Sequence, residues 1–195
     1  KDPAKFLSQV MFVIGRCWGD MLVESHPLTG AAVPSLAESW EPSKDAATWT
    51  FKIRKGVKFH NGKDLTIEDV VATLKRHTDA KSESGALGVV KSIKEIKADG
   101  DNLVLTLTEG NADMPLLLTD YHLVIQPNGG YDDPLASIGT GPYKQVSFEP
   151  GVRATFERNK DDWRTDRGFV DSVEIITMND ATARIAALSS GQVHY

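Results

Sequence analysis

Three features of the sequence predict a mixed α/β fold. Apolar residues recur at helical spacing between Val10 and Leu22, which is typical of an amphipathic helix packed on a core. Apolar and polar side chains alternate with a period of two around Phe51 and Leu105, as they do in strands with one buried face. Turn pairs such as Asn61-Gly62 separate these segments. We therefore expect helices packed against strands that are joined by tight turns.

The first expected element is an amphipathic helix at roughly 7–23. A turn at 26–30, which contains Pro27 and Gly30, ends it. The apolar face of this helix is expected to carry Val10, Val13, Ile14, Cys17, Trp18, Met21 and Leu22.

Strands follow a turn at 42–45. Trp49, Phe51 and Ile53 alternate with polar residues and predict a strand with one buried face. A second, short strand is expected at 57–59, just before the Asn61-Gly62 turn.

Thr66 is the strongest helix start in the sequence. Its hydroxyl can accept a hydrogen bond from the backbone N–H of Asp69, and the Asp69 carboxylate can answer as in a capping box. Leu65 and Val70 stand where a hydrophobic staple would be. We expect the helix to end near His77.

The rest of the chain is expected to alternate between short helices, strands and loops. Asp180, or Asn179 before it, is expected to cap the last helix, and Gly191 stands where a helix C-cap glycine belongs. The remaining elements are, in order, a loop at 78–88, two strands around the turn at 99–100, a short helix at 114–118, a buried strand at 122–125, a loop at 126–137, a hairpin at 143–158 around the turn at 150–151, a strand at 170–177 and a strand from 192 to 195.

Composition excludes several classes of protein. The 195 residues carry 22 basic and 27 acidic side chains, with a net charge of −5. No basic stripe with interleaved aromatic residues is present, so nucleic-acid binding is not expected. No apolar run approaches the roughly 18–20 residues that a membrane-spanning helix needs. Cys17 is the single cysteine, so neither an internal disulfide nor a cysteine metal cluster can form, and we expect a buried thiol.

No catalytic, metal or cofactor motif is found. The five histidines are scattered without ligand spacing, and no Gly-x-Ser-x-Gly elbow occurs. Gly139-Thr140-Gly141 resembles the start of a dinucleotide-binding loop, but Lys144 occupies the position of its last glycine. Gly139 and Gly141 are instead expected to provide unusual backbone angles. We therefore expect no enzyme activity, no metal and no cofactor.

Several motifs, in order and at the right spacing, carry a family resemblance. They are Asp2-Pro3, the segments 34–40, 48–62 and 65–70, the run Gly139-Thr140-Gly141-Pro142-Tyr143, the segment from Arg158 to Trp163, and the helix at 180–191. Together they resemble the family 5 solute-binding proteins, which are the dipeptide, oligopeptide and nickel binders of ABC importers. One departure is His194, which stands where the family usually has an acidic residue.

The resemblance implies a fold of the type II periplasmic-binding-protein kind, a clamshell of two lobes. Residues 1–195 would be part of the first lobe, with a candidate subdomain at about 41–130. The second lobe would be absent from this chain. The chain begins at Lys1 rather than at methionine, so we expect the natural start and the signal peptide to be missing.

The resemblance also implies a ligand site in the cleft between the lobes. Asp120 can pair with a ligand ammonium, Tyr121 and His122 can stack or form hydrogen bonds, and Met11 and Phe6 can offer apolar contact. The loop at 84–87 is expected to border the same cleft. The first lobe would contribute Phe6, Gln9, Met11, Phe12, Asp120, Tyr121 and His122.

The expected function is therefore capture of a small peptide or peptide-like solute and its delivery to the membrane permease of an ABC importer. Such a protein would be monomeric and extracytoplasmic, either free in the periplasm or held by a lipid anchor. Nickel chelate, haem, oligosaccharide and opine remain alternative ligands. A hydrolase is an alternative of another class, which the missing catalytic motifs disfavour.

Overall fold

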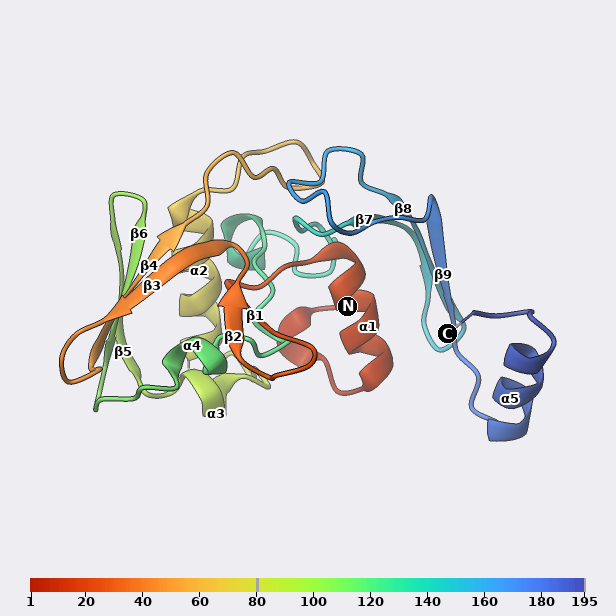
Figure 1. Ribbon diagram of the computed structural model, residues 1–195, viewed down its shortest axis with the longest axis horizontal. Coiled ribbons are helices and arrows are strands. Elements are labelled where there is room, and N and C mark those ends of the chain that lie inside the picture. Colours follow the sequence, from red (N-terminus) through yellow and green to blue (C-terminus); the bar gives the residue numbers. More distant parts are fainter. Residues whose placement is uncertain (80, 195) are drawn as a thin grey trace.

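The computed structural model describes residues 1–79 and 81–194, and Figure 1 shows their arrangement. A four-stranded sheet backed by helices forms one end of the molecule. Helix α1 (Gln9–Trp18) lies in the middle, and a three-stranded sheet leads to helix α5 (Ala181–Ser189) at the other end. This arrangement confirms the mixed α/β fold. Within the described ranges, no helix is both long and apolar enough to cross a bilayer.

The larger sheet is antiparallel, with its strands in the order β3-β4-β6-β5. These strands span Ala37–Pro42 (β3), Thr48–Ile53 (β4), Ile93–Asp99 (β5) and Asn102–Leu107 (β6). Phe51 of β4 stands opposite Trp40 on one side and Leu103 on the other. Alternate residues of β4 and β6 are buried, so the period of two in the sequence correctly predicted their inner faces.

Helix α2 (Ile67–Thr78) packs against β5 and β6. Its start is the predicted capping box, in which the Thr66 backbone N–H donates to the Asp69 carboxylate at 2.9 Å. Val70 and Leu74 on its inner face are fully buried. The predicted helix and its capping residue are therefore confirmed.

The amino-terminal helix is shorter than predicted. After a 3₁₀ turn, η1 (Pro3–Lys5), helix α1 ends at Trp18 rather than near residue 23. Gly19 then takes an extended conformation, and a methyl group on it would collide with Val124. Only a glycine therefore fits at this helix end against the neighbouring segment.

The buried face of α1 is also narrower than predicted. Ile14 and Trp18 are buried, whereas Val10 and Val13 are 39% and 47% exposed. No described element covers these two valines. The chain beyond the helix forms a hairpin of β1 (Val23–Ser25) and β2 (Ala32–Pro34), which confirms the turn predicted between them.

Two predicted short strands are wrong. Residues 57–59 contribute only an isolated bridge between Lys58 and Asp64. Residues 122–125 are buried but belong to no strand. Instead, the Ile125 N–H donates to the carbonyl of Asp20 at 3.0 Å. An apolar run predicts burial, but it does not identify the group that pairs with its backbone.

Short helical segments complete this part of the fold. Helix α3 begins within the loop predicted at 78–88, in which Ala80 lies outside the described residues. The short helix predicted at 114–118 is confirmed. The segments are α3 (Leu87–Val90), α4 (Met114–Leu117) and the 3₁₀ turn η2 (Pro127–Gly130).

The smaller sheet has the order β7-β8-β9 and is antiparallel. Its strands are β7 (Tyr143–Glu149), β8 (Arg153–Arg158) and β9 (Ser172–Ile176). The predicted turn at Pro150-Gly151 joins the first two, with Gly151 at a φ of 72°. In the described chain β9 pairs with β8 alone, so its outer edge is open (Figure 1).

Helix α5 begins as predicted, because the Asp180 carboxylate accepts a hydrogen bond from the Ala183 N–H at 2.7 Å. Gly191 follows the helix with a φ of 72°, which fits its predicted capping position. The strand predicted from 192 does not form at 192–194, and Tyr195 lies outside the described residues.

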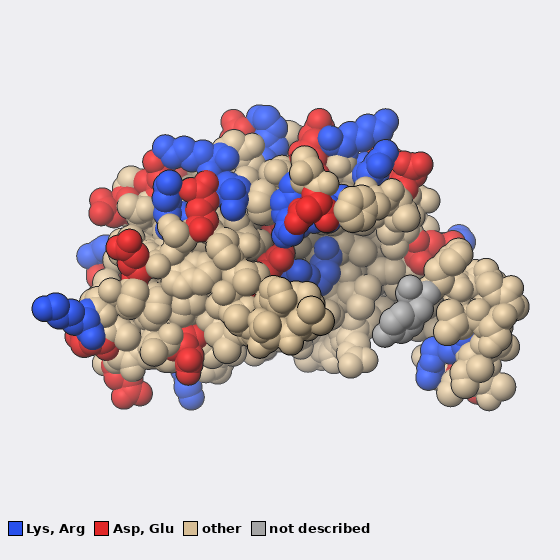
Figure 2. Space-filling view, in the orientation of Figure 1, with Lys and Arg blue, Asp and Glu red and all other residues tan. Residues whose placement is uncertain are grey.

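The surface carries both signs of charge. Figure 2 shows acidic and basic side chains interspersed along one rim of the molecule, with a largely uncharged area across the middle of this face. No stripe of a single sign runs across the face in view.

Candidate functional site

The start of helix α1 and the loop after helix α4 meet at one face of the molecule. The ring nitrogen Nε2 of His122 lies 2.8 Å from the carbonyl oxygen of Phe6, across a sequence separation of 116 residues. The rings of Phe12 and Tyr121 meet edge to face, with their centroids 5.6 Å apart. The two groups of residues expected to contact a solute are therefore adjacent in the fold.

Local hydrogen bonds and burial fix the segment before α1. Phe6 and Ser8 are extended, and the Ser8 hydroxyl caps the helix by accepting from the Met11 N–H at 3.4 Å. The Phe6 ring is buried beneath the helix, so close that a methyl group on Gly15 would lie 2.6 Å from it. Leu7 stands between them and is 91% exposed. Its N–H and C=O make no hydrogen bond with any described residue.

The loop after α4 is organised by an ion pair. The Asp120 Oδ1 atom accepts from the His122 backbone N–H at 2.9 Å and lies 2.6 Å from the ring atom Nδ1. Both ring nitrogens of His122 thus face oxygen acceptors, so a doubly protonated ring satisfies both contacts. Asp120 Oδ2 makes no hydrogen bond with a described residue.

The environment shifts both pKa values in the direction that favours this pair. Burial alone would lower the pKa of His122, but its hydrogen bonds to Asp120 and to the Phe6 carbonyl outweigh burial and raise it. Burial alone would raise the pKa of Asp120, but the hydrogen bonds from His122 outweigh burial and lower it. The loop therefore presents a fixed carboxylate near neutral pH.

The predicted site residues differ in what they can offer a ligand. The rings of Phe6 and His122 are buried, which corrects the expectation that these rings contact the solute. They support the site from behind, because Phe6 packs under α1 and His122 holds Asp120. Of the remaining residues, Gln9 and Phe12 are exposed, and Met11, Asp120 and Tyr121 are half-buried.

A hollow of about 400 Å³ opens at this face. Its size falls within the range of small-molecule sites, which is about 300–1,000 Å³. The residues that line it are Leu7, Ser8, Gln9, Phe12 and Tyr121. Three of these are among the residues predicted from the sequence, whereas Leu7 and Ser8 were not selected. The sequence feature that could have identified them is a leucine directly before a serine that can cap a helix.

The loop at 84–87 lies behind the site rather than along it. Ser84 is buried and lies 2.6 Å from the Nδ1 atom of His77. Gly85 packs so tightly on the His122 ring that a methyl group there would collide with it. This loop therefore fixes the position of His122.

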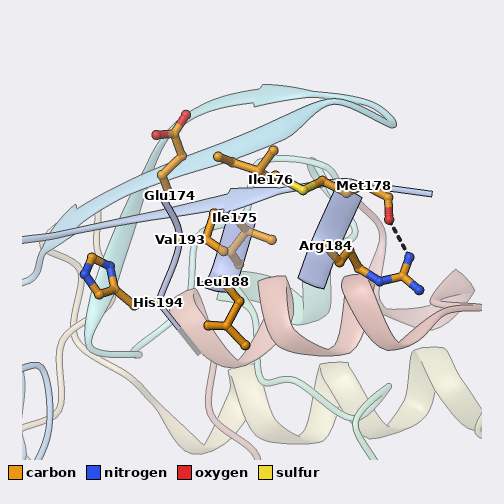
Figure 3. A pocket seen from close by; sticks show the side chains of 8 residues that line it. All are labelled: Glu174, Ile175, Ile176, Met178, Arg184, Leu188, Val193 and His194. Atoms are coloured by element: carbon orange, nitrogen blue, oxygen red, sulfur yellow. Dashed lines mark hydrogen bonds between the residues drawn. The ribbon is translucent and has the colours of Figure 1, made fainter. Parts of the chain in front are cut away.

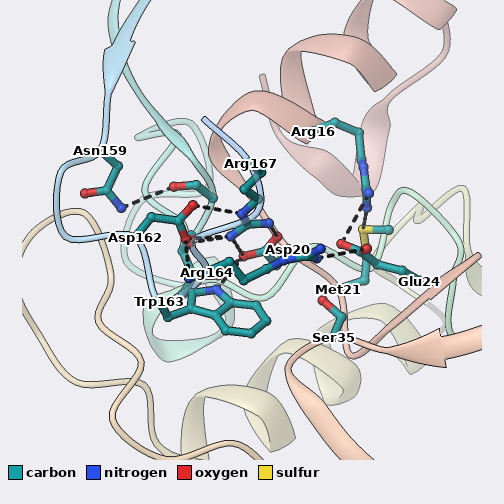
Figure 4. Close-up of polar contacts among 12 residues, drawn as sticks. Arg16, Asp20, Met21, Glu24, Ser35, Asn159, Asp162, Trp163, Arg164 and Arg167 are labelled. Atoms are coloured by element: carbon teal, nitrogen blue, oxygen red, sulfur yellow. Dashed lines mark hydrogen bonds and ion pairs between the residues drawn. The ribbon is translucent and has the colours of Figure 1, made fainter. Parts of the chain in front are cut away.

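A second cluster, which sequence reasoning missed, joins the segment after α1 to the loop between β8 and β9 (Figure 4). Arg167 donates to both carboxylate oxygens of the buried Asp20, at 2.6 and 2.9 Å, and also to Asp162 at 2.8 Å. Trp163 and Thr140 donate to Asp20 as well, at 3.0 and 2.8 Å. Burial would raise the pKa of Asp20, but these donors, with Arg167 foremost, outweigh it and lower the pKa.

The cluster explains two of the motif positions. A methyl group on Gly139 would collide with the Trp18 backbone, and one on Gly141 would lie 2.6 Å from it. Neither glycine has a positive φ, which corrects the expectation of unusual backbone angles. Both are glycines because the segment before β7 passes directly against the end of α1. Asp20 and Arg167 are 147 positions apart, and nothing in the sequence relates them.

A second hollow of about 380 Å³ lies between β9 and α5 (Figure 3). None of the predicted ligand residues lines it. Its lining is largely apolar, and the side chains in Figure 3 include Ile175, Leu188 and Val193, with Arg184 hydrogen-bonded to the Met178 carbonyl at 2.6 Å. No set of convergent polar groups marks it as a binding site.

The described residues contain no group of three histidine, cysteine, aspartate or glutamate side chains placed to hold a metal ion. The polar groups of the candidate site are instead one carboxylate, one amide side chain and the unpaired backbone groups of Leu7. Such groups recognise an organic solute through hydrogen bonds and charge.

The chain is similar in sequence to curated binding proteins. The chain is 30% identical to the di/tripeptide-binding protein 1 of Pseudomonas aeruginosa UCBPP-PA14, over 82% of this chain and 35% of that protein. It is 31% identical to the oligopeptide-binding protein AppA of Bacillus subtilis 168, over 83% of this chain and 32% of that protein. It thus spans about a third of the length of these curated relatives.

The fold has a close counterpart among solved structures. The binding protein AgaA from A. tumefaciens R10, solved in complex with agropinic acid, superposes with a TM-score of 0.91 and 30% identity. The match covers 98% of this chain and 40% of AgaA. Residues 31–195 also match the family described as bacterial extracellular solute-binding proteins, family 5 Middle. This chain therefore belongs to the bacterial extracellular solute-binding proteins of family 5.

Proposed function

We propose that this chain forms one lobe of a substrate-binding component of an ABC importer, which captures small peptides or peptide-like solutes. The observation that carries the proposal is the meeting of the start of α1 with the Asp120–His122 loop at one open face. These are the segments from which the family resemblance led us to expect ligand contacts. The peptide-binding relatives named above support the same class of solute.

The groups at this face suit a peptide. Leu7 is 91% exposed, and its backbone N–H and C=O are free to pair with the main chain of an extended ligand. The Oδ2 atom of Asp120 is available for a ligand ammonium, and His122 keeps that carboxylate ionised and in place. A peptide offers both an ammonium group and unpaired backbone groups.

The rest of the cleft is supplied by a second lobe outside this chain, because the chain spans about a third of its relatives. A solute that contacts both lobes favours the closed state, and the closed state docks on the membrane permease. The region at about 41–130 is proposed as a subdomain of the first lobe. The complete protein acts as an extracytoplasmic monomer, with or without a lipid anchor, and binds without catalysis or cofactor.

Thermal unfolding of the full-length protein with peptide pools tests this proposal. A solute present at a hundred times its Kd adds about 2.7 kcal/mol to the free energy of unfolding. The 195-residue chain alone should show little or no such gain, because it lacks half of the cleft. High affinity in the isolated chain, or turnover of the peptides, would contradict the proposal.

An opine is the second candidate ligand, since AgaA was solved with agropinic acid. The same unfolding assay with agropinic acid separates the two classes. Stabilisation by the opine and by none of the peptides would favour the opine. Nickel chelates, haem and oligosaccharides complete the screen.

A further inference from the structure

We infer that the hollow beside Leu7, Phe12 and Tyr121 is a subsite for an uncharged apolar side chain of the bound solute, and that an aromatic side chain suits it best. This inference rests on the proposed function, since it names the solute chemistry that the same face selects. It goes further in assigning specificity to three side chains, of which Leu7 lies outside the set expected from the sequence.

The walls of this hollow are apolar and aromatic. Phe12 and Tyr121 meet edge to face at 5.6 Å and leave ring surface toward the opening, since Phe12 is 40% exposed. A third ring would add a favourable aromatic contact beyond the area that it buries. Leu7, at 91% exposed, stands at the rim as an apolar side chain that no described residue covers.

The walls are also held in place before any ligand binds. Tyr121 packs on the ring of His122 with 4.0 Å between centroids. That ring is fixed by contacts at both nitrogens, one to Asp120 and one to the Phe6 carbonyl. A wall that is already ordered costs little entropy on binding, so its contacts contribute more fully to affinity.

The charges near the hollow disfavour an ionic occupant. No lysine, arginine, aspartate or glutamate lines it. Among nearby charges, Lys5 is paired with Glu83 at 3.0 Å, and one oxygen of Asp120 is paired with His122. Because the proposed function assigns the other oxygen of Asp120 to the ligand ammonium, an ionised side chain placed here would lose water without gaining a partner, which is costly. The subsite therefore selects against charge as well as for apolar area.

Calorimetric titration of the full-length protein with tripeptides tests the inference. The probes are three alanines with one residue replaced, at each position in turn, by phenylalanine, leucine, lysine or aspartate. At one position, phenylalanine should bind at least about tenfold tighter than alanine, a difference of 1.4 kcal/mol, and lysine and aspartate should bind more weakly than alanine.

Variants assign this preference to the hollow. Leu7→Ser changes a side chain that is 91% exposed, so the fold should not change, and it should reduce the preference for phenylalanine. Phe12→Ala should reduce the preference further, because it removes one of the two rings that line the hollow. Leu116→Ala, at a 43% exposed residue on α4 outside this hollow, is the matched control and should change nothing.

The outcomes separate this inference from the proposed function. If tripeptides bind but phenylalanine gives no advantage at any position, or both variants keep the full preference, the apolar subsite is wrong while peptide capture stands. If no peptide binds the wild-type protein, the proposed function fails, and the inference fails with it.

Discussion

Replacing Arg167 with methionine should destabilise this chain far more than replacing any surface arginine. Methionine keeps much of the volume of the side chain but removes the hydrogen bonds to Asp20 at 2.6 and 2.9 Å. The Asp20 side chain is 2% exposed, so its carboxylate would be left in the core with only neutral donors. Breaking a buried ion pair in this way costs about 3–5 kcal/mol.

The assay is urea unfolding of the 195-residue chain, followed by circular dichroism. For a chain of this size, each kcal/mol shifts Tm by about 2–4 °C, so the expected loss corresponds to roughly 6–20 °C. Arg158→Met is the matched control, because Arg158 pairs at 2.9 Å with an Asp171 that is 91% exposed. Such an exposed pair contributes only about 0–1 kcal/mol.

The pH dependence provides a second test of the same reasoning. The pKa of Asp20 is lower in the folded protein than in the unfolded chain, where it is near 3.9. The ionised Asp20 therefore stabilises the fold above the unfolded pKa, and this stability is lost as pH falls through the folded pKa. Without Arg167, burial opposes ionisation, so the deficit should be largest near neutral pH and shrink in acid. A deficit below about 1 kcal/mol at pH 7, or one independent of pH, would refute the role given to this pair.

Three further predictions concern other parts of the fold. Gly139→Ala should lower the free energy of unfolding in urea by about 1–3 kcal/mol, because its methyl group has no space. Gly88→Ala has nothing within 4 Å of the added methyl group and should be neutral or slightly stabilising. Equal effects would contradict the packing argument. The pKa of His122 is raised in the folded protein, so its ion pair with Asp120 stabilises the protein fully below the unfolded pKa of about 6.5. This stability is lost as pH rises through the folded pKa. Tm should therefore fall more between pH 6 and 8.5 in the wild-type protein than in His122→Gln. Burial raises the pKa of the Cys17 thiol to about 11, so iodoacetamide at pH 8 should alkylate the native chain much more slowly than the urea-unfolded chain, and equal rates would show that the thiol is accessible.

The sequence predicted most of what depends on local patterns. The strand at Trp49, the helix that begins after Thr66 and the hairpin at Pro150-Gly151 all follow from periodicity, capping and turn chemistry, and all are present. Such signals come from residues that are neighbours in the chain, so one sequence is enough to read them.

What the sequence could not supply was long-range pairing. Val10 and Leu22 share a helical period, yet α1 ends at Trp18 because Gly19 must fit against Val124. Residues 122–125 look like a strand, but part of their backbone pairs with Asp20 rather than with a neighbouring strand. In each case a partner more than a hundred positions away decides the local structure.

The candidate site shows the same division. The family resemblance located both segments, and their meeting in the fold is consistent with that prediction. It could not tell which side chains point outward, so Phe6 was expected at the surface, whereas its ring lies in the core, and Leu7 was overlooked. Side-chain direction at a helix start depends on what packs beneath it, which here includes Gly15.

The open edge of β9 has a practical consequence for anyone who prepares this chain by itself. Its backbone N–H and C=O groups face solvent along one side, next to Ile176 at 41% and Leu188 at 49% exposed. An uncovered strand beside apolar side chains is a template on which another copy can add a strand. Solutions of the isolated chain should therefore associate as concentration rises, and a charged residue at position 176 should keep them dispersed.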